Sequence, residues 1–380
     1  MKKILFILPS LEIGGTLSSF ISLYHQLKGR YIIDVFAISH DGQLDIPFSV
    51  DLMPKDCLIH AYRCNYANVR GFYRFITFLI KLFKRLLLLC NVNDEFIYKR
   101  LVKRLSNQYD VVIGFQEELP NQLASLIKAP QKYAWIHCDY SRYSGCGKEL
   151  SIYSQFTKIV CVSKYTAAVF ENYYPGLKED TIYIYNILDK DQIIEKSCES
   201  ITDSRFINDK FTIISVGRIA RVKRFEYVPA IAASMKEKGV SFIWYIIGPN
   251  LGDSCLQQLL DNIKYYNVED CVVYLGGKSN PYPYFKHSNL LVSLSLSEAC
   301  PMIFNEAKVL NVPAVSADFP SAYEFIKEGV NGEICSLDQM AAVLSGIIKN
   351  TDCYNSLVQN LSKESDINDD TLSKLNDLLD

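Results

Sequence analysis

Continuous apolar runs of four to seven residues alternate with helix-compatible stretches along most of this 380-residue chain. A strand that is apolar at every position is buried on both faces, as in parallel sheets that helices cover on both sides. We therefore predict an α/β protein built on parallel sheets. The predicted strands are residues 4–8, 32–38, 111–115, 133–137, 159–162 and 182–185, followed by 212–216, 242–247, 272–275, 290–296 and 312–316.

The strands form two series that a polar stretch separates. Residues 189–210 are rich in Lys, Asp, Glu and Ser, and no internal repeat relates the two halves. A chain of this length has room for two cores. The predicted division is a domain over residues 1–188, an interdomain region over 189–210, a second domain over 211–355 and a helical tail over 356–380. Parallel sheets bind ligands at the carboxyl ends of their strands, so two such sheets facing each other would form a central cleft.

Composition narrows the class of protein. Hydrophobic residues make up 49% and charged residues 22%, and the net charge of −2 gives no overall attraction to nucleic acid. The twelve cysteines form no C-x-x-C pair, and there are only five histidines. We expect a reduced, cytoplasmic protein without a metal site or bound cofactor. The apolar N-terminus stops at Pro9 without a cleavage site and is interpreted as a buried strand.

Two glutamates flank a predicted helix start near residue 301. Glu298 falls in the loop after the strand at 290–296, Pro301 suits the first helical turn, and residues 302–310 are compatible with a helix. Glu306 would lie roughly 7–8 Å further along the axis. The backbone N–H groups at Met302 and Ile303 would attract a diphosphate, and the carboxylates could each bind a pair of hydroxyls. Such spacing also arises by chance, and an acid in a first helical turn is simply favourable to the helix.

Basic residues follow the strand at 212–216. Gly217 allows a tight turn, and Arg218 and Lys223 would project from the loop that follows it. A guanidinium fork and an ammonium suit phosphate oxygens and could neutralise a departing diphosphate. The alternative is a solvated basic loop, which is the interpretation favoured for Arg221 and Arg224.

These motifs together resemble the retaining GT-B glycosyltransferases, specifically the bacterial glycosyltransferase family 4. The resemblance spans most of the chain, and residues 211–335 carry its specific part, including the final unit from Ala314 to Gly332. It implies two Rossmann-like domains with parallel sheets facing a central cleft. One departure is that Ala299 and Cys300 stand where the family commonly has Gly after its first Glu.

The resemblance assigns roles to individual residues. It implies that Arg218 and Lys223 bind the donor diphosphate, that Glu298 contacts the donor sugar and that Glu306 holds the ribose. His137, after the strand at 133–137, stands where the family has a histidine that hydrogen-bonds the donor sugar. A satisfied structural histidine is the alternative.

Three further segments have weaker assignments. Gly14 and Gly15 resemble the family's N-terminal glycine loop beside the donor phosphates, although a plain turn fits equally and no G-x-G-x-x-G motif is present. Residues 276–282 follow a strand and could present backbone to a base, or form a simple turn. Glu117 also follows a strand end and could face the acceptor.

Residues 70–104 hold nine Lys and Arg against Asp94 and Glu95, a local charge of +7, interleaved with Phe and Leu. The apolar stretch is too short and too interrupted to span a membrane. A basic amphipathic helix could dock on an anionic membrane surface, or could be a domain helix with a solvated basic face.

The function expected from this combination is transfer of a sugar, with retention, from a nucleotide-diphosphate donor to a glycan or lipid-linked acceptor in cell-surface polysaccharide synthesis. The donor sugar, base and acceptor stay open. A nucleotide-sugar epimerase of the same fold and a non-catalytic partner subunit are the alternatives.

Overall fold

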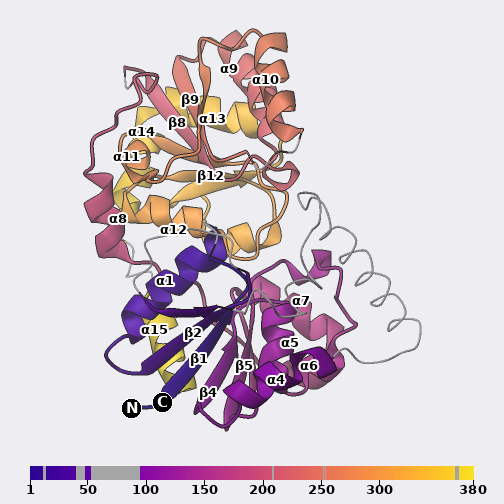
Figure 1. Cartoon of the computed structure of the whole chain (residues 1–380). Helices are drawn as coiled ribbons and strands as arrows, with labels where there is room; N and C mark the ends of the chain where they lie inside the picture. Colours follow the sequence, from indigo (N-terminus) through magenta and orange to yellow (C-terminus); the bar gives the residue numbers. More distant parts are fainter. Residues whose placement is uncertain are drawn as a thin grey trace, which may run out of the picture. The chain divides into compact units, whose positions relative to one another are not determined.

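The computed structural model describes residues 1–11, 14–39, 48–52, 95–207, 209–250, 252, 254–363 and 368–380. It divides into an N-terminal unit, Met1–Val162 with Thr166–Tyr185, and a C-terminal unit, Ser163–Tyr165 with Asn186–Asp380. Each unit contains one parallel sheet, so the prediction of two parallel-sheet α/β domains is confirmed (Figure 1). The predicted interdomain stretch, residues 189–210, lies within the C-terminal unit and includes a helix.

The first sheet has seven strands in the order β3-β2-β1-β4-β5-β6-β7. Its strands are β1 (Lys3–Leu8), β2 (Ile32–Ala37), β3 (Val50–Leu52), β4 (Val111–Gly114), β5 (Gln131–Ile136), β6 (Lys158–Cys161) and β7 (Thr181–Tyr183). The helices along this part of the chain are α1 (Gly15–Leu27), α4 (Glu95–Leu105), α5 (Leu119–Leu126), α6 (Leu150–Tyr153) and α7 (Lys164–Tyr173), with 3-10 turns at Tyr140–Arg142 and Pro175–Asp180.

Helices cover both faces of this sheet (Figure 1). On the α1 side, the rings of Phe6 and Phe20 meet with centroids 5.0 Å apart, and Phe115 joins them. On the other side, Leu5 and Ile7 belong to the core that α4 and α5 cover. Because successive strand residues point to opposite faces, full coverage explains why β1 is apolar throughout.

The second sheet has six strands in the order β10-β9-β8-β11-β12-β13. Its strands are β8 (Phe211–Val216), β9 (Phe242–Ile247), β10 (Val272–Gly276), β11 (Leu290–Ser293), β12 (Ala314–Ala317) and β13 (Gly332–Cys335). The helices are α8 (Lys190–Ser197), α9 (Val228–Glu237), α10 (Cys255–Tyr265), α11 (Tyr282–Lys286), α12 (Met302–Val309), α13 (Met340–Lys349), α14 (Thr351–Leu361) and α15 (Asp369–Leu379), with 3-10 turns at Arg221–Lys223, Phe225–Tyr227 and Pro320–Glu324.

A buried hydrogen-bond relay joins the middle of this sheet. The Trp244 indole, fully buried on β9, donates to Ser215 Oγ on β8 at 3.0 Å. That hydroxyl donates in turn to the Val292 carbonyl on β11 at 2.6 Å. Each buried polar group therefore has a partner, and the relay fixes β8 against both neighbours.

All eleven predicted strands overlap a strand of the structure, but two strands were missed. β3 and β13 lie at sheet edges, where a continuous apolar run is not needed, and β13 begins with Gly332 and Glu333. The predicted strand at 290–296 ends earlier, at Ser293. It does so because the N–H of Leu296 donates to the Val222 carbonyl in the loop after β8, at 2.8 Å.

Candidate functional site

The chain order of the second sheet reverses between β8 and β11, which are hydrogen-bonded neighbours. Ligands of open parallel sheets bind beyond the carboxyl ends of the strands at such a switch point. Gly217 and Arg218 follow β8, and Glu298 lies in the connection from β11 to α12. The structure thus places these predicted residues on the two loops that flank the switch point.

The loop after β8 is held by close backbone contacts. The Gly217 N–H donates to the Ile247 carbonyl at 2.9 Å, and the Ile219 N–H donates to the Pro249 carbonyl at 3.0 Å. A Cβ on Gly248 would overlap the Gly217 carbonyl, so the two turns approach as closely as they do only because residue 248 is glycine. These contacts fix the backbone from which Arg218 projects, and Arg218 itself is exposed.

Lys223 and Glu298 form an ion pair between the two loops. Their side chains are 19% and 20% exposed. Ser295 Oγ also donates to Glu298 Oε1 at 2.8 Å, and Ser321 Oγ donates to the Glu298 carbonyl at 2.6 Å. A Cβ on Gly217 would lie 3.1 Å from Lys223 Cε, so Gly217 leaves room for the lysine stem. The residues assigned to diphosphate and donor sugar therefore contact each other directly in this structure.

Helix α12 begins beside these loops. Pro301 is its N-cap, one position outside the predicted first turn, so Met302 and Ile303 are the first two helical residues. Backbone N–H groups in the first helical turn have no carbonyl partner within the helix and carry the positive end of its dipole. Helix α12 starts at Met302, as predicted, and ends at Val309, one residue before the predicted end.

Glu306 lies one turn further along α12 and is partly buried. The Tyr282 hydroxyl donates to its Oε1 at 3.3 Å. Burial raises the pKa of Glu306 to about 7, and Tyr282 and the charge of Lys223 act in the opposite direction. Its protonation state can therefore change near neutral pH. Sequence inspection missed Tyr282 as the partner, because 24 positions separate the two residues and no motif links them.

The N-terminal unit has its own switch point, between β1 and β4. Gly14 is the N-cap of α1 in extended conformation, and Gly15 is the first helical residue. Among the residues that the structure describes, a Cβ built on either glycine would meet nothing within 4 Å. No described atom therefore crowds the backbone at either position.

His137 follows β5, next to the Phe115 ring at a centroid distance of 4.7 Å. Burial lowers the pKa of His137 to about 3, so the imidazole is neutral at physiological pH. Among the described residues, its buried Nε2 atom has no hydrogen-bond partner. A neutral ring with an unpaired nitrogen can accept or donate one hydrogen bond to an incoming hydroxyl.

Glu117, at the end of the neighbouring strand, positions that histidine. Its carboxylate is only 4% exposed and accepts hydrogen bonds from the N–H groups of His137 and Cys138, the latter at 2.7 Å. Burial raises the pKa of Glu117, while these backbone donors lower it. The expectation that Glu117 faces an acceptor is wrong, because the carboxylate is turned inward to anchor the loop after β5.

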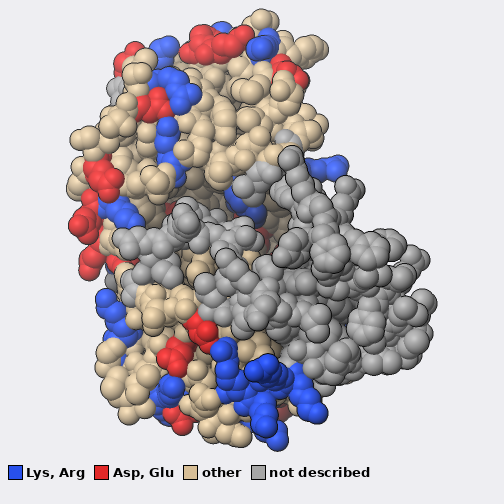
Figure 2. Space-filling model, in the orientation of Figure 1, with Lys and Arg blue, Asp and Glu red and all other residues tan. Residues whose placement is uncertain are grey.

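Basic residues gather on α4 (Figure 2). Lys99, Arg100, Lys103 and Arg104 are exposed there, and Arg104 pairs with Asp51 at 2.8 Å. Most of the predicted amphipathic segment, including residues 70–94, lies outside the described residues. Within the described part of the chain, no helix is both long and apolar enough to cross a membrane. The same residues include no cluster of three or more potential metal ligands, and their nine cysteines are free thiols.

The C-terminal part of the chain is similar to a known protein family. Residues 199–365 match the family model described as glycosyl transferases group 1. This segment is similar to the glycosyl transferases group 1 family. It contains Arg218, Lys223, Glu298 and Glu306, the four residues discussed above at the β8/β11 switch point.

Three curated relatives each match less than half of the chain. An uncharacterized glycosyltransferase of Methanocaldococcus jannaschii is 27% identical over 162 residues, covering 42% of this chain and 39% of the relative. The N-acetylgalactosamine-N,N'-diacetylbacillosaminyl-diphospho-undecaprenol 4-alpha-N-acetylgalactosaminyltransferase of Campylobacter jejuni is 28% identical over 166 residues, covering 43% and 42%. N-acetyl-alpha-D-glucosaminyl L-malate synthase of Bacillus anthracis is 24% identical over 173 residues, covering 45% and 44%. The match therefore spans less than half the length of each relative.

Solved structures match over the whole chain. Anabaena HepE in complex with UDP and glucose superposes with a TM-score of 0.76 at 16% identity, covering 100% of this chain and 99% of that one. A point mutant of S. aureus TarM, in complex with Fondaparinux, alpha-GlcNAc-glycerol and UDP, gives a TM-score of 0.69 at 13% identity, covering 100% of this chain and 99% of that one. At these identities the likeness establishes the fold, which is GT-B with two Rossmann-like domains, as predicted.

Proposed function

We propose that the protein transfers a sugar from a nucleotide-diphosphate donor to a hydroxyl of a glycan or lipid-linked acceptor, with retention of configuration. The observation that carries this proposal is the set of side chains at the β8/β11 switch point. Lys223 and Glu298 converge there from two loops, and α12 presents its N-terminus and Glu306 beside them. Cations, carboxylates and a helix N-terminus are the groups that a sugar joined to a nucleoside diphosphate requires.

The donor diphosphate would bind Arg218, Lys223 and the N–H groups of Met302 and Ile303. Its negative charge grows as the bond to the sugar breaks, and fixed cations and the helix dipole stabilise that charge. Gly217 gives Lys223 the space to reach the phosphate oxygens. Two cationic side chains and two backbone N–H groups can together stabilise the negative charge of the leaving diphosphate without a metal ion.

Donor binding would have to replace the ion pair between Lys223 and Glu298. In the exchange, the Lys223 ammonium moves from the carboxylate to the diphosphate. Glu298 becomes free to accept hydrogen bonds from sugar hydroxyls, and Ser295 keeps its carboxylate in place at 2.8 Å. This arrangement keeps both charges paired when no donor is bound and exposes them together when one arrives.

Glu306 would accept hydrogen bonds from the two ribose hydroxyls, with Tyr282 orienting its carboxylate. In the N-terminal unit, the neutral His137 would hydrogen-bond the donor sugar, and the backbone at Gly14 and Gly15 would border the phosphates and the acceptor. The resemblance described above supports these roles.

UDP is the nucleotide that the comparisons favour, since HepE and TarM were solved with UDP. One curated relative is named as an N-acetylgalactosaminyltransferase acting on a diphospho-undecaprenol-linked sugar, and another as an N-acetyl-alpha-D-glucosaminyl L-malate synthase. We therefore infer a UDP-activated N-acetylhexosamine as donor and a polyprenyl-diphosphate-linked glycan as acceptor, in surface polysaccharide synthesis at the cytoplasmic side of a membrane. The exposed cations of α4 suit an anionic lipid surface, where such an acceptor would reside.

A nucleotide-release assay tests this proposal. UDP-GlcNAc, UDP-GalNAc and UDP-glucose would be incubated with the protein, with and without a bacterial membrane lipid extract. UDP release that requires both donor and extract supports a transferase. Isomerisation of the donor without the extract would identify an epimerase instead, and absence of any nucleotide binding would favour a non-catalytic partner subunit.

A further inference from the structure

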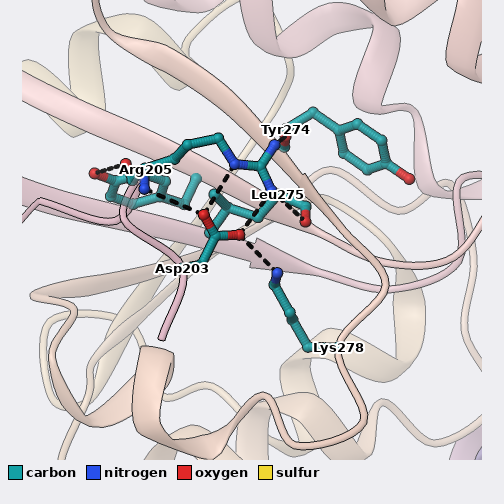
Figure 3. Close-up of polar contacts among 6 residues, drawn as sticks. Asp203, Arg205, Tyr274, Leu275 and Lys278 are labelled. Carbon is teal, nitrogen blue, oxygen red and sulfur yellow. Dashed lines mark hydrogen bonds and ion pairs between the residues drawn. The ribbon is translucent and has the colours of Figure 1, made fainter. Parts of the chain in front are cut away.

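A charged cluster outside the switch point joins residues 203–205 to the end of β10 (Figure 3). β10 is an edge strand with a register shift between Tyr274 and Gly276. Arg205 Nη1 donates to the Tyr274 carbonyl at 3.1 Å, and Nη2 donates to the Leu275 carbonyl at 3.0 Å. One guanidinium therefore binds the two carbonyls at the irregularity, where the regular ladder is interrupted.

Asp203 connects this guanidinium to the next loop. Its carboxylate accepts from Arg205 Nε at 2.9 Å and Nη2 at 2.6 Å, and from Lys278 Nζ at 2.7 Å. Hydrogen bonds from Arg205 and then Lys278 hold the pKa of Asp203 well below its usual range. The Asp203 and Lys278 side chains are only 12% and 21% exposed. The Arg205 side chain is 54% exposed, but its bidentate hydrogen bonds and its two carbonyl contacts still give the cluster a defined geometry.

Aromatic residues fix the backbone on which the cluster stands. The Phe206 ring lies 4.5 Å from the Tyr245 ring of β9 and 5.2 Å from the Tyr284 ring of α11. The Tyr245 hydroxyl accepts from the Ile207 N–H at 2.7 Å. Residues 203–207 are therefore anchored to the sheet. The cluster thus has a fixed backbone from which it can hold residues 276–280.

The supported segment, residues 276–280, leads to both ends of the proposed donor site. At its start, the Gly276 carbonyl accepts from the Gly248 N–H at 3.0 Å, and Gly248 packs against Gly217 beside Arg218. Two positions after its end comes Tyr282, the partner of Glu306. A base attached to a ribose at Glu306 would thus lie within reach of residues 276–280.

We propose that Asp203, Arg205 and Lys278 are positioning residues that hold the segment 276–280 in the shape that selects the nucleobase. The proposal rests on the proposed function. The cluster acts mainly on the base end of the donor, because its members contact the edge strand and this segment, whereas Arg218 and Lys223 serve the diphosphate. Loss of the cluster should therefore weaken base recognition and leave diphosphate recognition intact.

The test compares ligands with and without a base. Titration calorimetry would measure the affinity of the full chain for UDP, GDP, ADP and inorganic diphosphate. We expect Asp203→Asn to weaken the preferred nucleotide about tenfold, to reduce the preference among bases, and to leave inorganic diphosphate within about twofold. Lys278→Gln should show the same pattern, and it leaves the Asp203–Arg205 pair that supports folding. Asp203→Glu should restore part of the preference.

Asp270→Asn is the matched control, since Asp270 forms a 2.7 Å pair with Lys236 that is exposed and lies in the same unit. It should change none of the affinities. Unaltered nucleotide affinity in both Asp203→Asn and Lys278→Gln would overturn the proposal, as would equal losses for nucleotide and inorganic diphosphate. A wild-type protein that binds no nucleotide would overturn the proposed function together with this one.

Discussion

Lys223 and Glu298 stand 75 positions apart in the sequence and pair with each other at the carboxyl ends of the neighbouring strands β8 and β11. The pair joins a cation suited to a diphosphate with a carboxylate suited to a sugar. It places both charges at the switch point.

Replacing Glu298 by Gln should separate binding from turnover. The variant no longer has the anion that competes for Lys223, so UDP affinity should stay equal or rise by a few fold. Sugar transfer should fall by about 100-fold or more, since an electrostatic contact to the reacting sugar is lost. Calorimetry and the nucleotide-release assay measure the two effects separately. Weaker UDP binding combined with normal turnover would contradict the exchange of partners.

The raised pKa of Glu306 predicts a pH-dependent stability. The carboxyl of Glu306 keeps its proton to a higher pH in the folded protein than in the unfolded chain. Its contribution to the free energy of unfolding is therefore fully present below pH 4.5 and is lost as the pH rises through about 7. Glu306→Gln should therefore be more stable than wild type at pH 8, by about 1–3 kcal/mol, with no difference at pH 4. Urea denaturation at both pH values measures this. Glu328→Gln, at an exposed glutamate of the same unit, should show no such change.

Nucleotide binding should release a proton through the same residue. Ribose hydroxyls favour the ionised carboxylate, so binding at pH 6 should drive Glu306 to lose its proton. Calorimetry in buffers of different ionisation enthalpy should show release of about half a proton or more per UDP. The effect should vanish in Glu306→Gln. An unchanged proton release in that variant would place the titrating group elsewhere.

Glu117 should stabilise the fold because its side chain accepts hydrogen bonds, and not because it is charged. Glu117→Gln keeps an oxygen for the N–H groups of His137 and Cys138, whereas Glu117→Ala leaves both buried and unpaired. We expect the Ala variant to lose about 2–4 kcal/mol of unfolding free energy and the Gln variant less than about 1 kcal/mol. Chemical denaturation distinguishes them. Equal losses would mean that the ionised carboxylate itself stabilises the loop.

The exposed cations of α4 should bind anionic vesicles. Changing Lys99, Arg100 and Lys103 together to Gln should cost about 1 kcal/mol per charge in partitioning to vesicles that contain phosphatidylglycerol. Arg104 is kept because it pairs with Asp51. Vesicle sedimentation at low and high salt provides the measurement.

The control replaces Lys238, Lys264 and Lys327, three exposed lysines of the C-terminal unit, by Gln. Equal losses in the two triple variants would show that total charge, rather than the α4 surface, governs the association.

The sequence predicted the sheets well because buried parallel strands are apolar at every position, as in β9, where all six residues are buried. It also placed Lys223 and Glu298 after strands of the same predicted sheet, and residues at strand ends gather at one sheet edge whatever their separation. It could not predict that these two pair with each other. The Tyr282 contact to Glu306 and the Asp203 cluster were equally hidden, because they depend on side-chain placement after the chain has folded.

The prediction for Glu117 failed for the same reason. A carboxylate after a strand can point outward to a ligand or inward to backbone donors, and the residue type does not distinguish the two. The short edge strands β3 and β13 carried no apolar signal of their own.

The central claim is tested most directly by UDP release from a UDP-sugar in the presence of a polyprenyl-diphosphate-linked acceptor extract. The account predicts release by the wild-type protein that depends on both substrates and falls about 100-fold in Glu298→Gln. Absence of release with every UDP-, GDP- and ADP-sugar tried, from a folded protein that also binds none of these nucleotides, would contradict it.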